Sequence, residues 1–166
     1  MSTKTKVGKI ILIIPFALIA AALVLLVLFE LAIMGANNIV ARNTLHDITK
    51  IPLPENTEIV ETISVAEKVV GNGNGMQYFG AVLLKSDLTV EELEDYYENP
   101  SEWQFVEKQD GQIISTSENY ETPVTLYKGG EPLSFDTEIN GDNYYIVYRW
   151  GSTSSELLYT LDIRGN

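Results

Sequence analysis

The sequence predicts an α+β fold, in which an N-terminal single transmembrane helix is followed by a largely antiparallel β-sheet domain with one short amphipathic helix. Three observations predict it. Residues 10–29 carry no charge, and fifteen of these twenty residues are Ile, Leu, Val or Phe. Beyond residue 55, short segments show the alternation or the β-branched content of strands. Between them lies one segment with a helical apolar stripe and a helix-start signal.

The apolar segment has the length of a membrane span. At about 1.5 Å per residue, residues 10–29 extend about 30 Å, which is the thickness of the bilayer hydrocarbon. We predict a transmembrane helix over residues 10–34, contacting the lipid bilayer. A short tail, residues 1–9, precedes it and contains Lys4, Lys6 and Lys9 but no acid. The positive-inside rule therefore predicts a cytoplasmic N-terminus and an extracytoplasmic C-terminal domain at the cell membrane.

A cleaved signal peptide is the alternative to a retained signal-anchor. Signal peptides have apolar cores of about 7–15 residues followed by a small-x-small cleavage site. The run here is longer, and its best site, Met34-Gly35-Ala36, has a bulky residue at the −3 position. We therefore expect the anchor to be retained.

Residues 35–54 read as a juxtamembrane stalk or linker. The membrane helix could continue through them, but Gly35 and the pair Asn37-Asn38 weaken a helix at that point. Pro52 and Pro54 end any helix and mark the start of the domain at residue 55.

The acidic domain, residues 55–166, begins with strands. Residues 57–65 are rich in β-branched side chains, and residues 76–85 are apolar on both faces, as in a central strand. A helix follows over residues 90–98, where Thr89 and Glu92 form a capping box and Leu88 with Leu93 fits a hydrophobic staple.

Further strands are expected after the helix. The predicted segments are residues 103–108, 113–117, 124–128 and 133–139, the last with clean alternation. Asn140-Gly141 is a strong hairpin signal that leads into residues 143–150. Residues 156–163 are expected to close the sheet.

Composition excludes several function classes. From Asn37 onward there are 8 Lys and Arg against 22 Asp and Glu, a net charge of 8 − 22 = −14. Such a domain is repelled by nucleic-acid phosphates, so we expect no nucleic-acid partner. There is no cysteine, and His46 is the only histidine, which removes thiolate chemistry and histidine-rich metal sites. We assign no catalytic, cofactor-binding or metal-binding residue.

The glycine-rich and acidic motifs have ordinary explanations. Residues 71–75 alternate Gly and Asn, but the spacing is not that of a dinucleotide-binding loop and a strand follows. The acids of residues 91–98 form the solvated face of the predicted helix. The acids keep one alternative open, an extracytoplasmic carboxylate-based hydrolase. A pocket with two acids of raised pKa would favour it.

The aromatic residues suggest where a partner could bind. Tyr144 and Tyr148 share one face of the strand over residues 143–150, and Tyr145 and Arg149 share the other. Tyr and Arg are enriched in binding hot spots, so one of these pairs is the candidate partner-binding site if its face is open to solvent. We expect a membrane-tethered interaction or accessory domain without catalytic activity, binding a protein or an envelope component. The one Asn-x-Ser/Thr match, Asn99-Pro100-Ser101, is not a glycosylation acceptor because of its proline, and this favours a bacterial cell envelope.

Overall fold

The computed structural model describes residues 3–71, 74–97, 104–117 and 122–165, and it describes side chains from residue 14 onward. One long helix, α1 (Thr3–Thr49), leads into a domain that contains a four-stranded antiparallel sheet and two short α-helices. The predicted α+β class is therefore confirmed.

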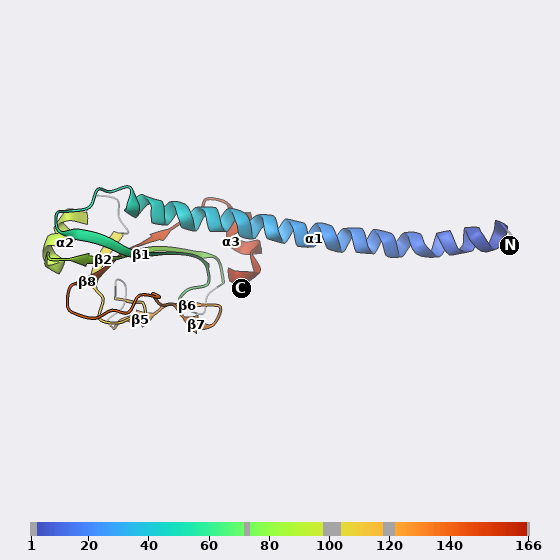
Figure 1. The fold of residues 1–166 in the computed structure, drawn as a ribbon. Coiled ribbons are helices and arrows are strands. Elements are labelled where there is room, and N and C mark those ends of the chain that lie inside the picture. Colours follow the sequence, from blue (N-terminus) through green and yellow to red (C-terminus); the bar gives the residue numbers. More distant parts are fainter. Residues whose placement is uncertain (1–2, 72–73, 98–103, 118–121, 166) are drawn as a thin grey trace.

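The first half of α1 projects away from the domain (Figure 1). In the part of the chain that the structure describes, α1 is the one helix long and apolar enough to cross a membrane. Large apolar side chains from Ile14 to Leu31 are more than half exposed along it. Pro15 lies inside the helix, near the end that projects. These features suggest a membrane anchor.

The second half of α1 is a layer of the domain. The helix continues through Gly35 and Asn37-Asn38 to Thr49, although we expected both features to weaken it. Its buried residues recur at helical spacing, namely Ile33, Asn37, Ala41, Thr44 and Ile48, and the last four face the sheet. The helix persists because this stripe is packed, which outweighs the low helix propensity of Gly and Asn.

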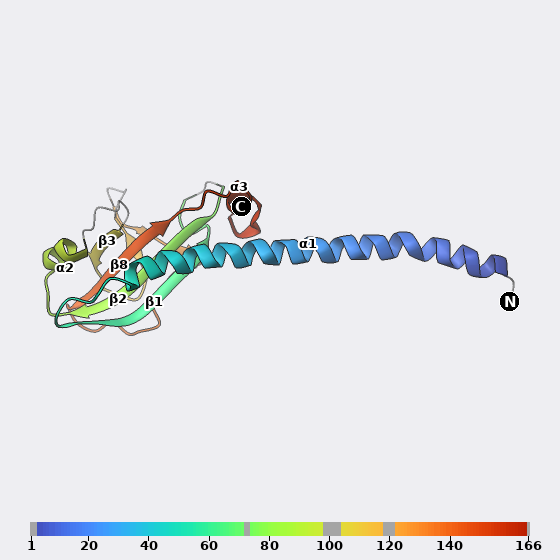
Figure 2. The ribbon, with the colours of Figure 1, turned by 90° about the horizontal axis from the view of Figure 1, so that it is seen from above.

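Strands β1 (Thr57–Glu67), β2 (Gln77–Ser86), β8 (Tyr144–Gly151) and β3 (Gln104–Lys108) form the main sheet in that order, with every neighbouring pair antiparallel. The central strand β2 is buried along nearly its whole length, as its two-sided apolar pattern predicted. A register shift interrupts β1 between Ile59 and Glu61. From there β1 returns along α1 toward the projecting helix (Figure 2).

The face of the sheet beneath α1 also holds α2 (Val90–Tyr97). The predicted capping box is present, because Thr89 N–H donates to Glu92 Oε2 at 2.9 Å and Glu92 N–H donates to Thr89 Oγ1 at 3.3 Å. Leu93 and Tyr97 are buried, and Leu88 packs against the same cluster.

The opposite face of the sheet is covered by irregular chain with two small hairpin-like pairs. These are β4 (Ser115–Thr116) with β5 (Val124–Thr125), and β6 (Tyr127–Lys128) with β7 (Glu131–Pro132). The strand predicted over residues 133–139 is wrong, since this stretch contributes only an isolated bridge at Ser134. Its alternation is real, however, because Leu133 and Phe135 are buried against the sheet while Ser134, Asp136 and Glu138 are exposed.

The last expected strand, residues 156–163, is also wrong. This segment forms α3 (Glu156–Leu161), followed by a short 3₁₀ helix, η1 (Ile163–Gly165). Ser155 caps α3, since its hydroxyl accepts from Leu158 N–H. The segment packs on α1 instead of joining the sheet, so the sheet has four strands where more were expected.

Two glycines let α1 approach the sheet closely. A Cβ atom on Gly80 of β2 would lie 2.6 Å from the backbone nitrogen of Leu45, and one on Gly151 would lie 2.0 Å from Thr44 Oγ1. Both distances are too short for any real contact. Glycine at these two positions therefore sets how near the helix lies to the sheet.

Candidate functional site

The structure divides the four residues of the predicted partner-binding strand between the two covered faces of the sheet. Tyr145 is 8% exposed and packs with α1 and α2, while Tyr148 is fully buried in the opposite cluster. Tyr144 and Arg149 are partly exposed. Arg149 lies 3.9 Å from Asp47 of α1. Partner binding on β8 stays a prediction. Of the four predicted residues, Tyr144 and Arg149 are the ones that a partner could reach.

A buried polar network, which we call the junction network, lies where α1 enters the domain. The side chain of Asn37 donates from Nδ2 to Asp162 Oδ2 at 2.8 Å and to the carbonyl of Leu158 at 2.9 Å. Its Oδ1 accepts from the hydroxyl of Tyr78 at 2.7 Å. One asparagine thus joins α1 to β2 and to the C-terminal segment. Each bond satisfies a polar group that burial would otherwise penalise.

Arg164 extends this network toward the surface. It donates to both carboxylate oxygens of Asp162, at 2.9 Å from Nε and 2.6 Å from Nη2. It also donates to Asn38 Oδ1 at 2.8 Å and to the carbonyl of Met34 at 3.2 Å. The planar guanidinium therefore clamps the C-terminal segment to α1 through several donors at once.

The charges of this network perturb one another. Burial alone would raise the pKa of Asp162, but hydrogen bonds from Arg164 and Asn37 outweigh it and hold that pKa below its usual value. The pKa of Arg164 is raised, chiefly by its bonds to Asp162. Burial, with the Asp162 charge nearby, raises the pKa of Tyr78 to about 12. Asp162 and Arg164 are thus held as an ion pair at neutral pH.

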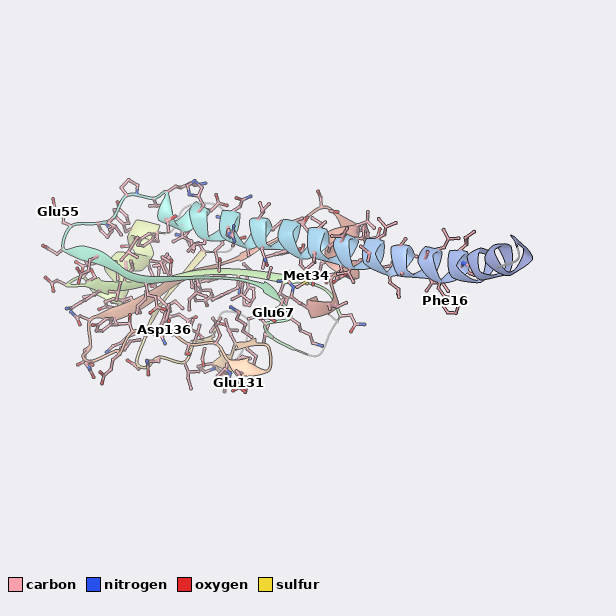
Figure 3. The ribbon with its side chains drawn as sticks, turned by 45° about the vertical axis from the view of Figure 1, so that its right-hand side comes forward. Phe16, Met34, Glu55, Glu67, Glu131 and Asp136 are labelled. Atoms are coloured by element: carbon pink, nitrogen blue, oxygen red, sulfur yellow. The ribbon has the colours of Figure 1, made fainter. Side chains whose placement is uncertain are left out.

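A cleft of about 290 Å³ opens beside this network, between α1 and the edge strand β1. We call it the α1–β1 groove. Its lining comes from α1, β1, β6 and η1, and consists of Asn38, Ala41, Arg42, Ser64, Val65, Ala66, Glu67, Lys128 and Arg164. In Figure 3, Glu67 and Met34 are labelled toward the end of the domain from which α1 projects, and Glu55 is labelled at the opposite end.

The groove is locally basic in an acidic domain. Three of the eight basic residues after Asn37 line it, namely Arg42, Lys128 and Arg164, against the single acid Glu67. Arg42 and Lys128 are exposed, whereas Arg164 is held by Asp162. Clustered like charges are costly unless something neutralises them, so this arrangement suits a carboxylate or another small anionic group.

Two other clefts bear on the hydrolase alternative, because each contains two acids. One, of about 340 Å³, contains Glu58 and Asp87, and the other, of about 270 Å³, contains Glu94 and Glu107. Glu107 accepts hydrogen bonds from the hydroxyl of Tyr148 and from Ser117 N–H. These bonds give its carboxylate a structural role.

The carboxylates with shifted pKa have structural partners as well. Burial would raise the pKa of Glu61, but backbone N–H groups of Asp136 and Thr137 outweigh burial and lower it. The pKa of Asp162 is lowered too, whereas a carboxyl group that acts as a general acid needs a raised pKa. No group of three or more His, Asp or Glu arranged for a metal ion occurs within the described ranges. In the Gly-Asn loop, residues 72–73 lie outside the described residues.

The fold and the junction network define a class of protein. It is an α+β domain built directly onto a helix that is long and apolar enough to cross a membrane. No protein-family model, curated protein or solved structure matches the chain.

Sequence reasoning missed the junction because its parts lie far apart in the chain. Asn37 and Asp162 are 125 positions apart. One signal was available, since Asn37 interrupts a stripe of small or apolar residues that continues with Ala41, Thr44 and Ile48. An amide inside such a stripe indicates a buried polar partner, although it does not identify that partner.

Proposed function

We propose that this protein is a membrane-tethered accessory protein without catalytic activity, whose extracytoplasmic domain binds a protein partner at the α1–β1 groove. The observation that carries the proposal is the concentration of Arg42, Lys128 and Arg164 around one groove of an otherwise acidic domain. The lysines before the apolar helix support the extracytoplasmic orientation.

The chemistry of the domain selects the kind of partner. A net charge of −14 after Asn37 repels a polyanion, which argues for a protein over an acidic envelope polymer. The groove brings together two exposed cations and a fixed guanidinium. A partner with a basic contact surface and one protruding carboxylate side chain would satisfy both features.

Affinity capture tests the proposal. Full-length protein and the double variant Arg42→Ala with Lys128→Ala are captured from their own membrane, and co-purifying proteins are identified by mass spectrometry. We expect the variant to lose a protein that the wild type retains, because each exposed cation removed weakens a charged contact by about 1–2 kcal/mol. Both side chains are exposed, so we expect thermal stability to be unchanged.

The matched control removes two exposed lysines elsewhere, Lys50→Ala with Lys108→Ala, and keeps the same net charge as the groove variant. Equal loss in both variants would indicate a general charge effect and contradict the groove. A third variant, Tyr144→Ala with Arg149→Ala, tests the β8 site predicted from sequence. Loss confined to that variant would move the partner to β8.

A further inference from the structure

The C-terminal segment exposes an unusual amount of apolar surface. Leu157 is 60% exposed, Tyr159 45%, Leu161 42% and Ile163 66%. All four lie within seven consecutive residues of α3 and η1, and none of them belongs to a core cluster. We call this group the C-terminal apolar patch. A concentration of large apolar side chains on a short surface segment marks a contact with something else.

The patch lies at the end of the domain from which α1 projects. Figure 1 shows α3 and the C-terminus beside α1 at that end, while α2 occupies the other end. Two hydrogen bonds fix the position along the helix. Ile163 N–H donates to Glu30 Oε1 at 3.0 Å, and the carbonyl of Leu158 accepts from Asn37 at 2.9 Å.

These bonds place the Ile163 end of the patch at the depth of the lipid head groups and the Leu157 end farther out. Glu30 follows directly on the uncharged run that ends at Phe29. At about 1.5 Å per residue, Ile163 is level with a point about 2 Å beyond that run, and Leu158 with a point about 12 Å beyond it. The polar region of a bilayer extends about 5–8 Å beyond the hydrocarbon on each side. The Ile163 end of the patch therefore overlaps the polar region of the bilayer.

We propose that the C-terminal apolar patch docks on the membrane surface, so that α3 and η1 are a second, interfacial membrane contact beside the transmembrane helix. This inference depends on the part of the proposed function in which α1 spans the membrane. The apolar surface of α1 reaches Leu31, which is 57% exposed, and Ile163 of the patch lies at the same level along the helix.

The chemistry of the patch fits an interface. The isoleucine side chain enters the boundary of the acyl region, and the tyrosine ring suits the layer between apolar and wet surroundings. Asp162 is fully buried and paired with Arg164, so it presents no charge to the lipid. Glu156, the other acid of the segment, is exposed and begins α3, next to the Leu157 end of the patch. Glu30 accepts the N–H of Ile163 at the same level. The domain thus rests on the bilayer, and the α1–β1 groove lies close to the membrane.

Depth-dependent fluorescence quenching tests the proposal. The chain contains no cysteine, so single cysteines can be introduced and labelled with an environment-sensitive fluorophore. Full-length variants Leu157→Cys, Ile163→Cys, Leu18→Cys and Glu131→Cys are reconstituted in phosphatidylcholine vesicles. The vesicles contain lipids with spin labels at the head group, at a shallow acyl position or at a deep acyl position.

We expect the label at position 163 to lose fluorescence with head-group and shallow spin labels, and the label at position 157 to be quenched less, because it lies farther from the hydrocarbon. The label at position 18 should be quenched by deep spin labels, and the label at position 131 by none. Quenching at position 18 without quenching at position 163 would overturn the docking proposal and leave the membrane span intact. Absence of quenching at position 18 would instead overturn the span on which the docking depends.

A second copy of the chain is the competing occupant of the patch. In that case, labels at positions 157 and 163 would report an apolar environment without lipid quenching. Unlabelled Ile163→Cys protein would also form disulfide-linked dimers in the vesicles. That combination would overturn the membrane-docking proposal.

Discussion

At the scale of single residues, Asn37 links three parts of the molecule that the sequence keeps apart. Its amide contacts β2 through Tyr78 and the C-terminal segment through Leu158 and Asp162. Asparagine is a poor residue for the interior of a helix, and it is tolerated here because donor and acceptor are both satisfied. In the described part of the chain, every fully buried side-chain nitrogen or oxygen has a partner.

Replacing Asp162 with Asn should change how stability depends on pH. The pKa of Asp162 is lowered on folding, so its contribution is fully present above its ordinary value near 3.8 and is lost as pH falls through the folded value. We expect Asp162→Asn to cost about 2–3 kcal/mol at pH 7, because it removes charged hydrogen bonds and leaves Arg164 without its carboxylate. The cost should shrink below about pH 4, the ordinary range of an aspartate.

Denaturant unfolding of the full-length protein in detergent micelles, from pH 7 down to pH 3, measures this effect. The matched control is Asp110→Asn, which removes an exposed carboxylate 4.0 Å from Lys108. This control should cost less than about 1 kcal/mol. A constant difference between Asp162→Asn and wild type at every pH would contradict an ionised Asp162 in the folded protein.

At the scale of elements, the sequence predicted those helices and strands whose formation depends on neighbouring residues. The capping box at Thr89 and Glu92 fixed the start of α2, and the two-sided apolar pattern identified β2 as central. The long uncharged run likewise identified the projecting half of α1.

Long-range contacts decided the elements that were missed. Residues 156–163 contain alternating apolar side chains, yet their backbone is helical because the segment docks on α1 through Asn37. Residues 133–139 alternate because a covering layer buries every second side chain just as a sheet does. Alternation of apolar residues shows which side chains are buried, but it does not show whether the segment pairs with another strand.

The close packing of α1 on β2 gives a prediction with opposite signs at two glycines. Gly80→Ala should destabilise the protein by about 1–3 kcal/mol, because its Cβ would lie 2.6 Å from the backbone of Leu45 and the helix must move. Gly35→Ala should stabilise by up to about 1 kcal/mol, since nothing lies within 4 Å of its Cβ and alanine favours a helix.

Thermal unfolding of both variants in the same micelles checks this prediction. Gly111→Ala serves as a control outside α1, because its Cβ would also meet nothing within 4 Å. Equal stability of Gly80→Ala and wild type would mean that α1 does not lie against the sheet at the described distance.

At the scale of the whole molecule, α1 serves both as the candidate membrane span and as a layer of the domain. Residues 35–49 are therefore packed chain and not a free stalk, because Asn37, Ala41, Thr44 and Ile48 face the sheet. The domain is held at a fixed height and orientation relative to the projecting helix. The junction network and the two close glycine contacts make this coupling rigid.

This continuity predicts that the mature protein retains residues 10–34, and the lysines that precede the apolar run predict that the domain lies outside the cell. Cleavage after Ala36 would divide α1 beside Asn37, the residue that joins the helix to Tyr78 and Asp162. It would also remove Met34, whose carbonyl accepts from Arg164, and Glu30, which accepts from Ile163. A processed domain would therefore lose part of its own core layer.

Intact-mass spectrometry of the membrane fraction measures retention, and protease added to intact cells measures orientation. We expect a mass that includes residues 10–34, and loss of the domain from cells treated with protease. A mature N-terminus at Asn37 or beyond would contradict retention whatever the orientation. Full protection in intact cells, with digestion only after lysis, would place the domain in the cytoplasm and contradict the orientation alone. Since the lysines precede the apolar run, replacing Lys4, Lys6 and Lys9 with Glu should weaken the orientation preference and leave retention unchanged.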